Sequence, residues 1–145
     1  MAATFTAADI YTSGGKYPDR PKRYPPTKTD AVNATLLASR VTRLCAEYER
    51  ATGLQAPAPQ DISSGYRPAA INAATPGAAK KSKHMICAAV DLGAAGGHAF
   101  ALWCLQNESA LAMCDLYLEH PDDTPTWCHL QCIPPGSGKR VFRAK

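Results

Sequence analysis

The one long stretch of helical periodicity in this chain lies between residues 30 and 52, and every other apolar stretch is short. Apolar side chains recur there at the spacing of one helix face, at Leu37, Val41, Leu44 or Cys45, and Tyr48. Thr29 or Asp30 can cap the start of this helix, and Gly53 follows its end. Twelve prolines and ten glycines divide the rest of the 145-residue chain into short elements. These features predict one small compact domain.

The short elements are a mixture of helices and strands. We expect an extended segment over 61–64, a helix over 69–74, a buried strand over 85–92, a helix over 98–107 that can continue to 113, and strands over 116–119 and 127–133. The turn-rich residues 120–125 separate the last two strands, which can form a hairpin. The predicted fold class is α+β, a small single domain with two or three helices packed on an antiparallel sheet.

The two ends lack this patterning. Residues 1–29 are predicted to be an irregular N-terminal arm, because 12–29 contain four prolines and no apolar periodicity. We expect this arm to wrap around the domain or to dangle from it. Residues 30–133 form the predicted domain, and 134–145 form a basic tail rich in proline and glycine.

The charge of the chain is mildly positive. Sixteen Lys and Arg against twelve Asp and Glu give a net charge of +4, which favours anionic partners such as cell-wall polymer or nucleic acid. A nucleic-acid-binding protein would show a basic helix or an aromatic platform. The sequence shows neither, so we predict no nucleic-acid partner.

Two further features bear on localisation. No apolar run approaches the ~20 residues of a membrane span, so we predict no membrane insertion. The first eleven residues have neither the basic start nor the apolar core of a secretion signal. We therefore expect synthesis in the cytoplasm without an export signal, where a disulfide framework is disfavoured. The six cysteines show no paired zinc spacing, and most are predicted to be buried small hydrophobic residues.

Three segments carry residues suited to metal or carboxylate chemistry, namely Ser64-Gly-Tyr-Arg67, Ser82-x-His84-x6-Asp91 and Trp127-x-His129. A catalytic zinc needs three protein ligands and one open position, and His84, Asp91 and His129 supply such a set. Seven residues along a flat strand would place His84 and Asp91 on opposite faces, so a turn after His84 must redirect the chain. His129 can then point across the sheet at Asp91.

The run SGYRPAAINAATPGAAKKSKHMICAAVDL, residues 64–92, resembles the zinc D-alanyl-D-alanine carboxypeptidase and phage endolysin peptidase family. The family pattern is SGYR, an Asn, GGA, SxHxxGxAxD and then a WxH strand, and the resemblance covers about residues 30–131. It implies a zinc ion held by His84, Asp91 and His129. It also implies that Arg67 lies near the substrate carboxylate or the scissile carbonyl. The residues implied beside Arg67 in substrate binding are Ser82, Tyr66 and Trp127.

The chain departs from the family pattern at three positions. Cys87 replaces the glycine of SxHxxGxAxD, and Pro76 replaces the first glycine of GGA. Many members carry an acid three residues before the last His, where this chain has Thr126. Threonine cannot accept a proton from the attacking water near neutral pH. Another residue must therefore act as general base if the protein is an enzyme.

Glu119 is the predicted replacement base. A hairpin between 116–119 and 127–133 would bring its carboxylate beside the metal, and residues 115–119 resemble a D-Q-L-I-x-E strand of phage relatives. Asp122 and Asp123, in the loop of the hairpin, are the alternative bases.

Two functions follow as hypotheses. The first is a zinc peptidase that cleaves peptide bonds in bacterial peptidoglycan stem peptides. Residues 116–142 are similar to a branch common in phage genomes, so the resemblance implies a phage-encoded endolysin or a wall hydrolase carried in the virion. The second is a catalytically degenerate virion protein of the tail or tail tip, with other virion proteins as partners. The Thr126 substitution and the proline-rich arm favour this alternative.

Overall fold

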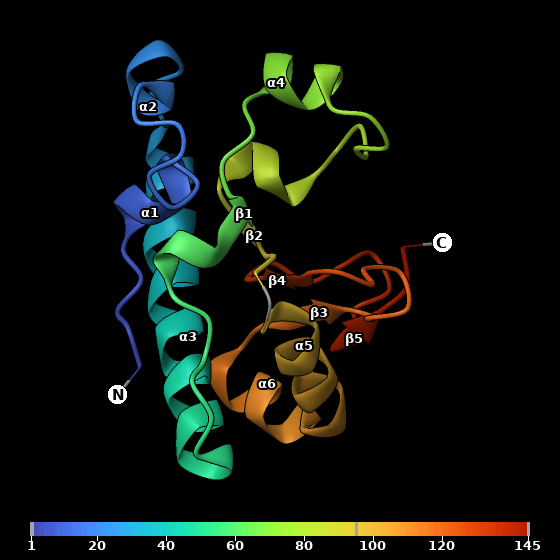
Figure 1. Cartoon of the computed structure of the whole chain (residues 1–145). Helices are drawn as coiled ribbons and strands as arrows, with labels where there is room; N and C mark the ends of the chain where they lie inside the picture. Colours follow the sequence, from blue (N-terminus) through green and yellow to red (C-terminus); the bar gives the residue numbers. More distant parts are fainter. Residues whose placement is uncertain (1, 95, 145) are drawn as a thin grey trace.

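The computed structural model describes residues 2–94 and 96–144 of the chain. They form an α+β domain in which a long helix and several shorter ones pack around a small mixed sheet and leave part of one sheet face open to a cavity, as Figure 1 shows for the helices and strands. The predicted fold class is confirmed. No helix among the described residues is long and apolar enough to cross a membrane.

The long helix α3 (Lys28–Thr52) packs one face against the sheet. A capping box between Thr27 and Asp30 starts the helix, and Gly53, in the left-handed conformation, ends it. Its buried side chains recur every three or four residues, at Asn33, Ala34, Leu37, Ala38, Val41, Leu44, Cys45 and Tyr48. The predicted helix is confirmed, but its N-cap is Thr27 and not Thr29 or Asp30, because Asp30 is the third residue of the helix and completes the capping box from inside.

The sheet has the strand order β1-β2-β4-β3-β5. Its strands are β1 (Ile62–Ser64), β2 (Ala89–Leu92), β3 (Tyr117–Glu119), β4 (Cys128–Gln131) and β5 (Val141–Phe142). All neighbouring pairs are antiparallel except β3 and β5, which are parallel. The predicted hairpin of the third and fourth strands is confirmed. The fifth strand lies in the segment predicted to be a tail.

The central strands β2 and β4 separate the core from the opposite face of the sheet. Val90, Leu92, Cys128 and Leu130 point into the hydrophobic core. By the alternation of strand side chains, Asp91 and His129 lie on the other face, and they stand opposite each other in the β2–β4 register. The register thus brings together two polar residues that are 38 positions apart in the chain.

Five shorter helices complete the structure. They are α1 (Ala7–Tyr11), α2 (Arg20–Arg23), α4 (Ala69–Ala74), α5 (Gly97–Gln106) and α6 (Glu108–Cys114). The first two lie beside α3, while α5 and α6 cover the lower end of the sheet in Figure 1. The helix predicted over 98–107 is α5, and its possible continuation to 113 is a separate helix, α6, because the two are interrupted at Asn107.

The N-terminal arm wraps onto the folded domain, one of the two expected arrangements, and it contains the short helices α1 and α2 within the segment expected to be irregular. Phe5 and Ile10 are buried in the core. The Ile10 carbonyl accepts a hydrogen bond from Tyr66 N at 2.8 Å, and Ser13 Oγ accepts one from Gly65 N at 2.9 Å. These contacts hold the arm against the strand that leads to Arg67, which gives the arm a structural role.

Gly65 is required where the arm crosses this strand. A Cβ atom added to Gly65 would lie 2.4 Å from the Ile10 carbonyl oxygen, a backbone atom that cannot move aside cheaply. We expect Gly65→Ala to lower the free energy of unfolding by about 1–3 kcal/mol, the usual cost of overpacking. Chemical denaturation measures this loss. Gly96→Ala is the control, because a Cβ there meets nothing within 4 Å; equal stability of the two variants would contradict the prediction.

Candidate metal centre and active site

His84 reaches the site face of the sheet because the chain turns sharply after it. It lies in the 3₁₀ helix η2 (Lys83–Ile86), which Ser82 caps by accepting a hydrogen bond from His84 N at 3.2 Å. Cys87 then takes a left-handed conformation with φ of 59°. This is the expected turn, at the position where the family pattern has glycine, the residue best suited to that conformation. The turn leads the chain into β2 and to Asp91.

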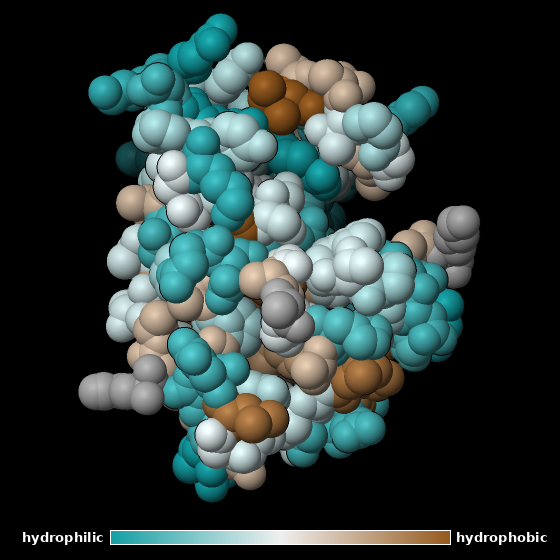
Figure 2. Space-filling view, in the orientation of Figure 1, coloured by the Kyte–Doolittle hydropathy of each residue, from teal (hydrophilic) through white to brown (hydrophobic). Residues whose placement is uncertain are grey.

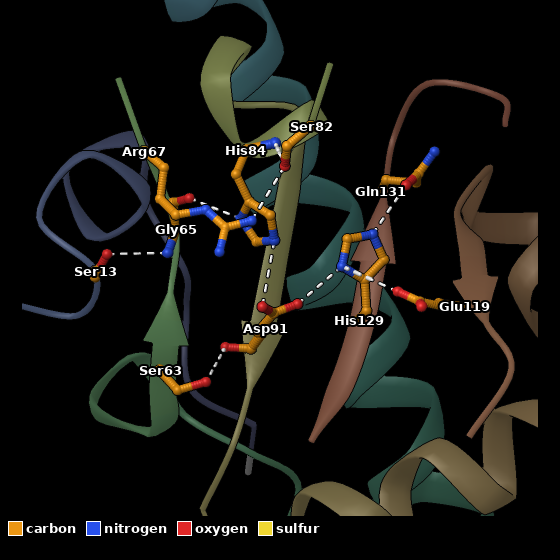
Figure 3. A network of polar contacts seen from close by, with 10 residues as sticks. All are labelled: Ser13, Ser63, Gly65, Arg67, Ser82, His84, Asp91, Glu119, His129 and Gln131. Carbon is orange, nitrogen blue, oxygen red and sulfur yellow. Dashed lines mark hydrogen bonds and ion pairs between the residues drawn. The ribbon is translucent and has the colours of Figure 1, made fainter. Parts of the chain in front are cut away.

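The carboxylate of Asp91 lies between the two histidines, as Figure 3 shows. Its Oδ2 is 3.3 Å from His84 Nε2, and its Oδ1 is 2.8 Å from His129 Nδ1. Burial by itself would raise the pKa of Asp91, but the two imidazoles outweigh it and hold the pKa well below its usual range. Asp91 is therefore ionised, as a metal ligand must be.

Each imidazole ring also has a hydrogen-bond partner on its second nitrogen, the one that does not face Asp91. His84 Nδ1 donates to the Gly65 carbonyl oxygen at 2.8 Å, so Nε2 is the ring nitrogen that faces Asp91. His129 Nε2 lies 2.9 Å from Gln131 Oε1. Burial by itself would lower the pKa of His129, but the hydrogen bond to Asp91 reverses the effect and raises it. Both rings thus have defined partners on the side away from Asp91.

These three residues fit a zinc ion. One ligand atom of each lies within 4.8 Å of the others. Ligands at about 2.1 Å from a tetrahedral zinc are about 3.4 Å apart, close to the contacts that Asp91 makes. The set of two imidazoles and one carboxylate is the kind that catalytic zinc sites use. His84, Asp91 and His129 would therefore hold the metal, and zinc binding itself stays a prediction.

Glu119 lies at the end of β3, beside the histidine of β4. Its Oε1 is 3.9 Å from His129 Nδ1. Burial raises the pKa of the Glu119 carboxyl above its usual value, although His129 opposes the shift. A carboxylate with a raised pKa near the metal ligands is a reasonable proton acceptor.

The alternative bases are placed less well. Asp123 accepts two hydrogen bonds from the Arg143 guanidinium, both at 3.0 Å, and this pairing lowers its pKa to about 2. Asp122 is largely exposed and faces His120 and Arg143. Thr126 is exposed and is not among the described residues that line the cavity. Glu119 is therefore the acid best placed to act on a substrate at the centre.

A cavity of about 760 Å³ opens in front of the centre, large enough for a peptide ligand. One wall comes from the segment between α4 and η2, with Lys81 and Lys83, and the opposite wall comes from residues 135–137 and 142–144. In Figure 2 the outline of the molecule is hollowed on its right side between these two walls. Glu119, Trp127 and Arg67 line the same space.

Arg67 and Ser82 are in direct contact. Arg67 Nη2 donates to Ser82 Oγ at 3.1 Å, and Arg67 N donates to the His84 carbonyl oxygen at 3.0 Å. Burial lowers the pKa of the guanidinium, while Asp91 raises it. Arg67 is thus tied to the ligand His84 and presents its charge to the cavity.

Tyr66 does not fit its predicted place in the substrate site. Its ring belongs to the hydrophobic core, with only 5% of the residue exposed, and it is not among the described residues that line the cavity. Tyr66 and Arg67 follow the end of β1, and their side chains lie on opposite sides of this segment. Arg67 faces the cavity, so Tyr66 faces inward.

The C-terminal segment supplies a wall that the sequence did not predict. Strand β5 pairs with β3, and the Phe142 ring contacts the His129 ring edge to face, with centroids 6.0 Å apart. The Arg143–Asp123 ion pair and a hydrogen bond from Ala144 N to Asp123, at 2.9 Å, hold the segment in place. No apolar periodicity marks these residues, because a two-residue strand is too short to show one.

The comparison with known families agrees with this geometry. The family model described as Peptidase M15 matches residues 27–120, well over half of the chain. The chain belongs to the peptidase M15 family. The M15 match includes Arg67, His84, Asp91 and Glu119, and it ends before His129, which the sheet register brings to the same centre. Neither a curated protein nor a solved structure matches the chain significantly.

The six cysteines and the two remaining histidines, His98 and His120, are not part of the cluster of His84, Asp91 and His129. All six cysteines are free and buried, as expected of small core residues. Cys128 points into the core while its neighbour His129 points to the cavity, so the two cannot share a metal. His98 is exposed, and His120 pairs with Asp122 at 3.7 Å.

Proposed function

We propose that this protein is a zinc-dependent peptidase that cleaves peptide bonds in the stem peptides of bacterial peptidoglycan. The observation that supports this proposal most directly is the cluster of His84, Asp91 and His129 at a large cavity. Glu119 and Arg67 line the same cavity. Membership of the M15 family supports a metallopeptidase. Three candidate ligands would hold the zinc, and an acid beside them could accept a proton from the attacking water.

The proposed reaction divides the work among these residues. When bound, zinc polarises the scissile carbonyl and makes a water nucleophilic near neutral pH. Glu119 accepts the proton that this water loses as the carbon–oxygen bond forms. It then returns the proton to the leaving amine as the carbon–nitrogen bond breaks.

Arg67 is proposed to anchor an anionic group of the substrate. Its planar guanidinium can bind a carboxylate with two hydrogen bonds or stabilise a developing oxyanion. Lys81 and Lys83 add positive charge to the same wall. Stem peptides end in carboxylates, so their charge suits this wall.

Purified bacterial sacculi provide the direct test. We expect the zinc-loaded protein to release peptide products or free amines from sacculi, and we expect a chelator to stop the release. Restoring zinc should restore it. Zinc-loaded protein that releases nothing from sacculi of several wall chemistries would refute the peptidase proposal.

Arg67→Lys tests the anchoring role. Lysine keeps the charge but loses the planar fork, so we expect kcat/KM to fall by about 10²-fold, while the protein still folds and binds zinc. Wall digestion and a thermal melt measure the two properties. Arg23→Lys, at an exposed position of α2, should leave both unchanged. Loss of folding in Arg67→Lys would instead assign Arg67 a structural role.

A virion structural or binding role is the second candidate. Thr126, at the position of the acid in many relatives, favours it. A protein that binds zinc and sacculi without hydrolysis would support this role. A phage origin remains a prediction from the sequence resemblance, and mass spectrometry of purified phage particles tests whether the protein is carried in a virion.

A further inference from the structure

Gln131 lies next to His129 on the site face of β4 and is almost fully buried, with 4% of its surface exposed. Its side chain makes two hydrogen bonds. The amide Nε2 donates to the Ile133 carbonyl oxygen at 2.8 Å, and the amide Oε1 lies 2.9 Å from His129 Nε2. Figure 3 shows the second contact on the side of the ring away from Asp91.

These two contacts fix which atom of the amide faces the ring. An amide NH2 group only donates, and a carbonyl oxygen only accepts. Donation to Ile133 therefore turns Oε1 toward His129. Since Oε1 can only accept, His129 Nε2 must carry a proton.

With Nε2 donating to Gln131, Nδ1 is the nitrogen that can bind a metal, which would take the place of the Nδ1 proton now donated to Asp91. His129 Nδ1 faces Asp91 Oδ1 at 2.8 Å and Glu119 Oε1 at 3.9 Å. His84 has the opposite arrangement, because its Nδ1 donates to the Gly65 carbonyl and its Nε2 faces Asp91. The two histidines thus present different ring nitrogens to one centre.

We propose that Gln131 is a positioning residue that sets the tautomer and the ring orientation of His129, so that this histidine binds zinc through Nδ1. The inference rests on the metal site of the proposed function. Gln131 is well placed for this role because β4 lies between two other strands, so its backbone position is fixed on both sides. Its backbone is paired with Ala89 of β2 on one side and with Tyr117 of β3 on the other. A hydrogen-bond partner behind a metal-binding histidine is worth about 10–100-fold in metal affinity.

The first test compares two substitutions of Gln131. Gln131→Met keeps the length and the apolar stem but removes the amide acceptor, and we expect the zinc dissociation constant to rise by about 10–100-fold. Gln131→Glu keeps an acceptor for His129 Nε2, and we expect its dissociation constant to stay within a few-fold of the wild type. Competition with a chelator of known affinity measures both. Gln106→Met, at an exposed position of α5, is the matched control and should bind zinc like the wild type.

The second test needs no variant. In the zinc-loaded wild type, ¹⁵N NMR of the His129 ring should show a protonated Nε2 and a metal-bound Nδ1. Binding through Nε2 would overturn the inference, as would a Met variant that binds zinc as tightly as the wild type, or a Glu variant as weak as the Met variant. Failure of the wild type itself to bind zinc would refute the metal site and this inference together. Normal zinc binding without wall hydrolysis would refute only the peptidase proposal.

Discussion

His129→Ala is expected to remove stoichiometric zinc from the purified protein. His129 is one of three proposed ligands, and the remaining pair, His84 and Asp91, would offer a zinc ion only two protein ligands. The loss in affinity should exceed the 10–100-fold that removal of an outer partner costs. Elemental analysis after expression with added zinc gives the metal content, and chelator competition gives the affinity.

The two spare histidines provide the controls for this variant. His98 is exposed on α5, and His120 pairs with Asp122 in the β3–β4 loop. His98→Ala and His120→Ala should each retain about one zinc per chain. If all three variants lose zinc to the same extent, the assignment of His129 as a ligand is wrong.

Glu119→Gln is expected to keep the fold and the zinc but to lower the hydrolysis rate by about 10²–10⁴-fold, the usual contribution of a general base. The substitution preserves the size of the side chain beside His129 and removes its ability to accept a proton. Rates on sacculi, measured at equal zinc content, show the effect. Because the base must be deprotonated to act, the rate of hydrolysis should fall as the pH drops through the pKa of Glu119, which burial raises above its usual value. Glu119→Gln should remove this fall.

Two other variants separate this role from alternatives. Thr126→Ala should change the rate little, because Thr126 is exposed. Asp123→Asn should retain most of the hydrolysis if Glu119 is the base, although it loosens the contact with Arg143. A larger loss in Asp123→Asn than in Glu119→Gln would move the role of base to Asp123.

The elements that the sequence predicted well are those with a strong local signal. The helix that ends at Thr52 has a regular apolar face, a capping box and a glycine at its end, all of which act within a few residues. The turn between His84 and Asp91 followed from their odd spacing and the need to share one centre. Cys87, with its positive φ, provides that turn.

The elements that were missed depend on distant contacts. Helices α1 and α2 are five and four residues long, too short for periodicity, and the arm is held by its contacts with Gly65 and Tyr66. Strand β5 exists because β3 offers it an edge. Such pairing depends on tertiary context and leaves little trace in a two-residue segment.

The site shows the same division. Spacing and resemblance pointed to His84, Asp91 and His129; the sheet register pairs Asp91 with His129, and the turn at Cys87 brings His84 to the same centre. Tyr66 was misplaced because the motif was taken as a unit, whereas the structure buries Tyr66 and turns Arg67 to the cavity. The alternation of β4 places Gln131 on the same face as His129. Its contact with the ring depends on the rotamers of both side chains, which no sequence pattern encodes.

The C-terminal wall of the cavity has a consequence for handling the protein. Residues 142–144 line the cavity, so a group attached at the C-terminal end of the protein would be joined close to this cavity. An affinity tag or a fusion partner attached there would compete with a bulky wall polymer for the entrance, and a histidine tag would also bring foreign imidazoles near the metal ligands. The N-terminal arm lies on the other side of the molecule, beside α3 (Figure 1). Attachment at that end therefore leaves the entrance clear, and a difference in activity between the two tagged forms would measure how closely this wall approaches the substrate.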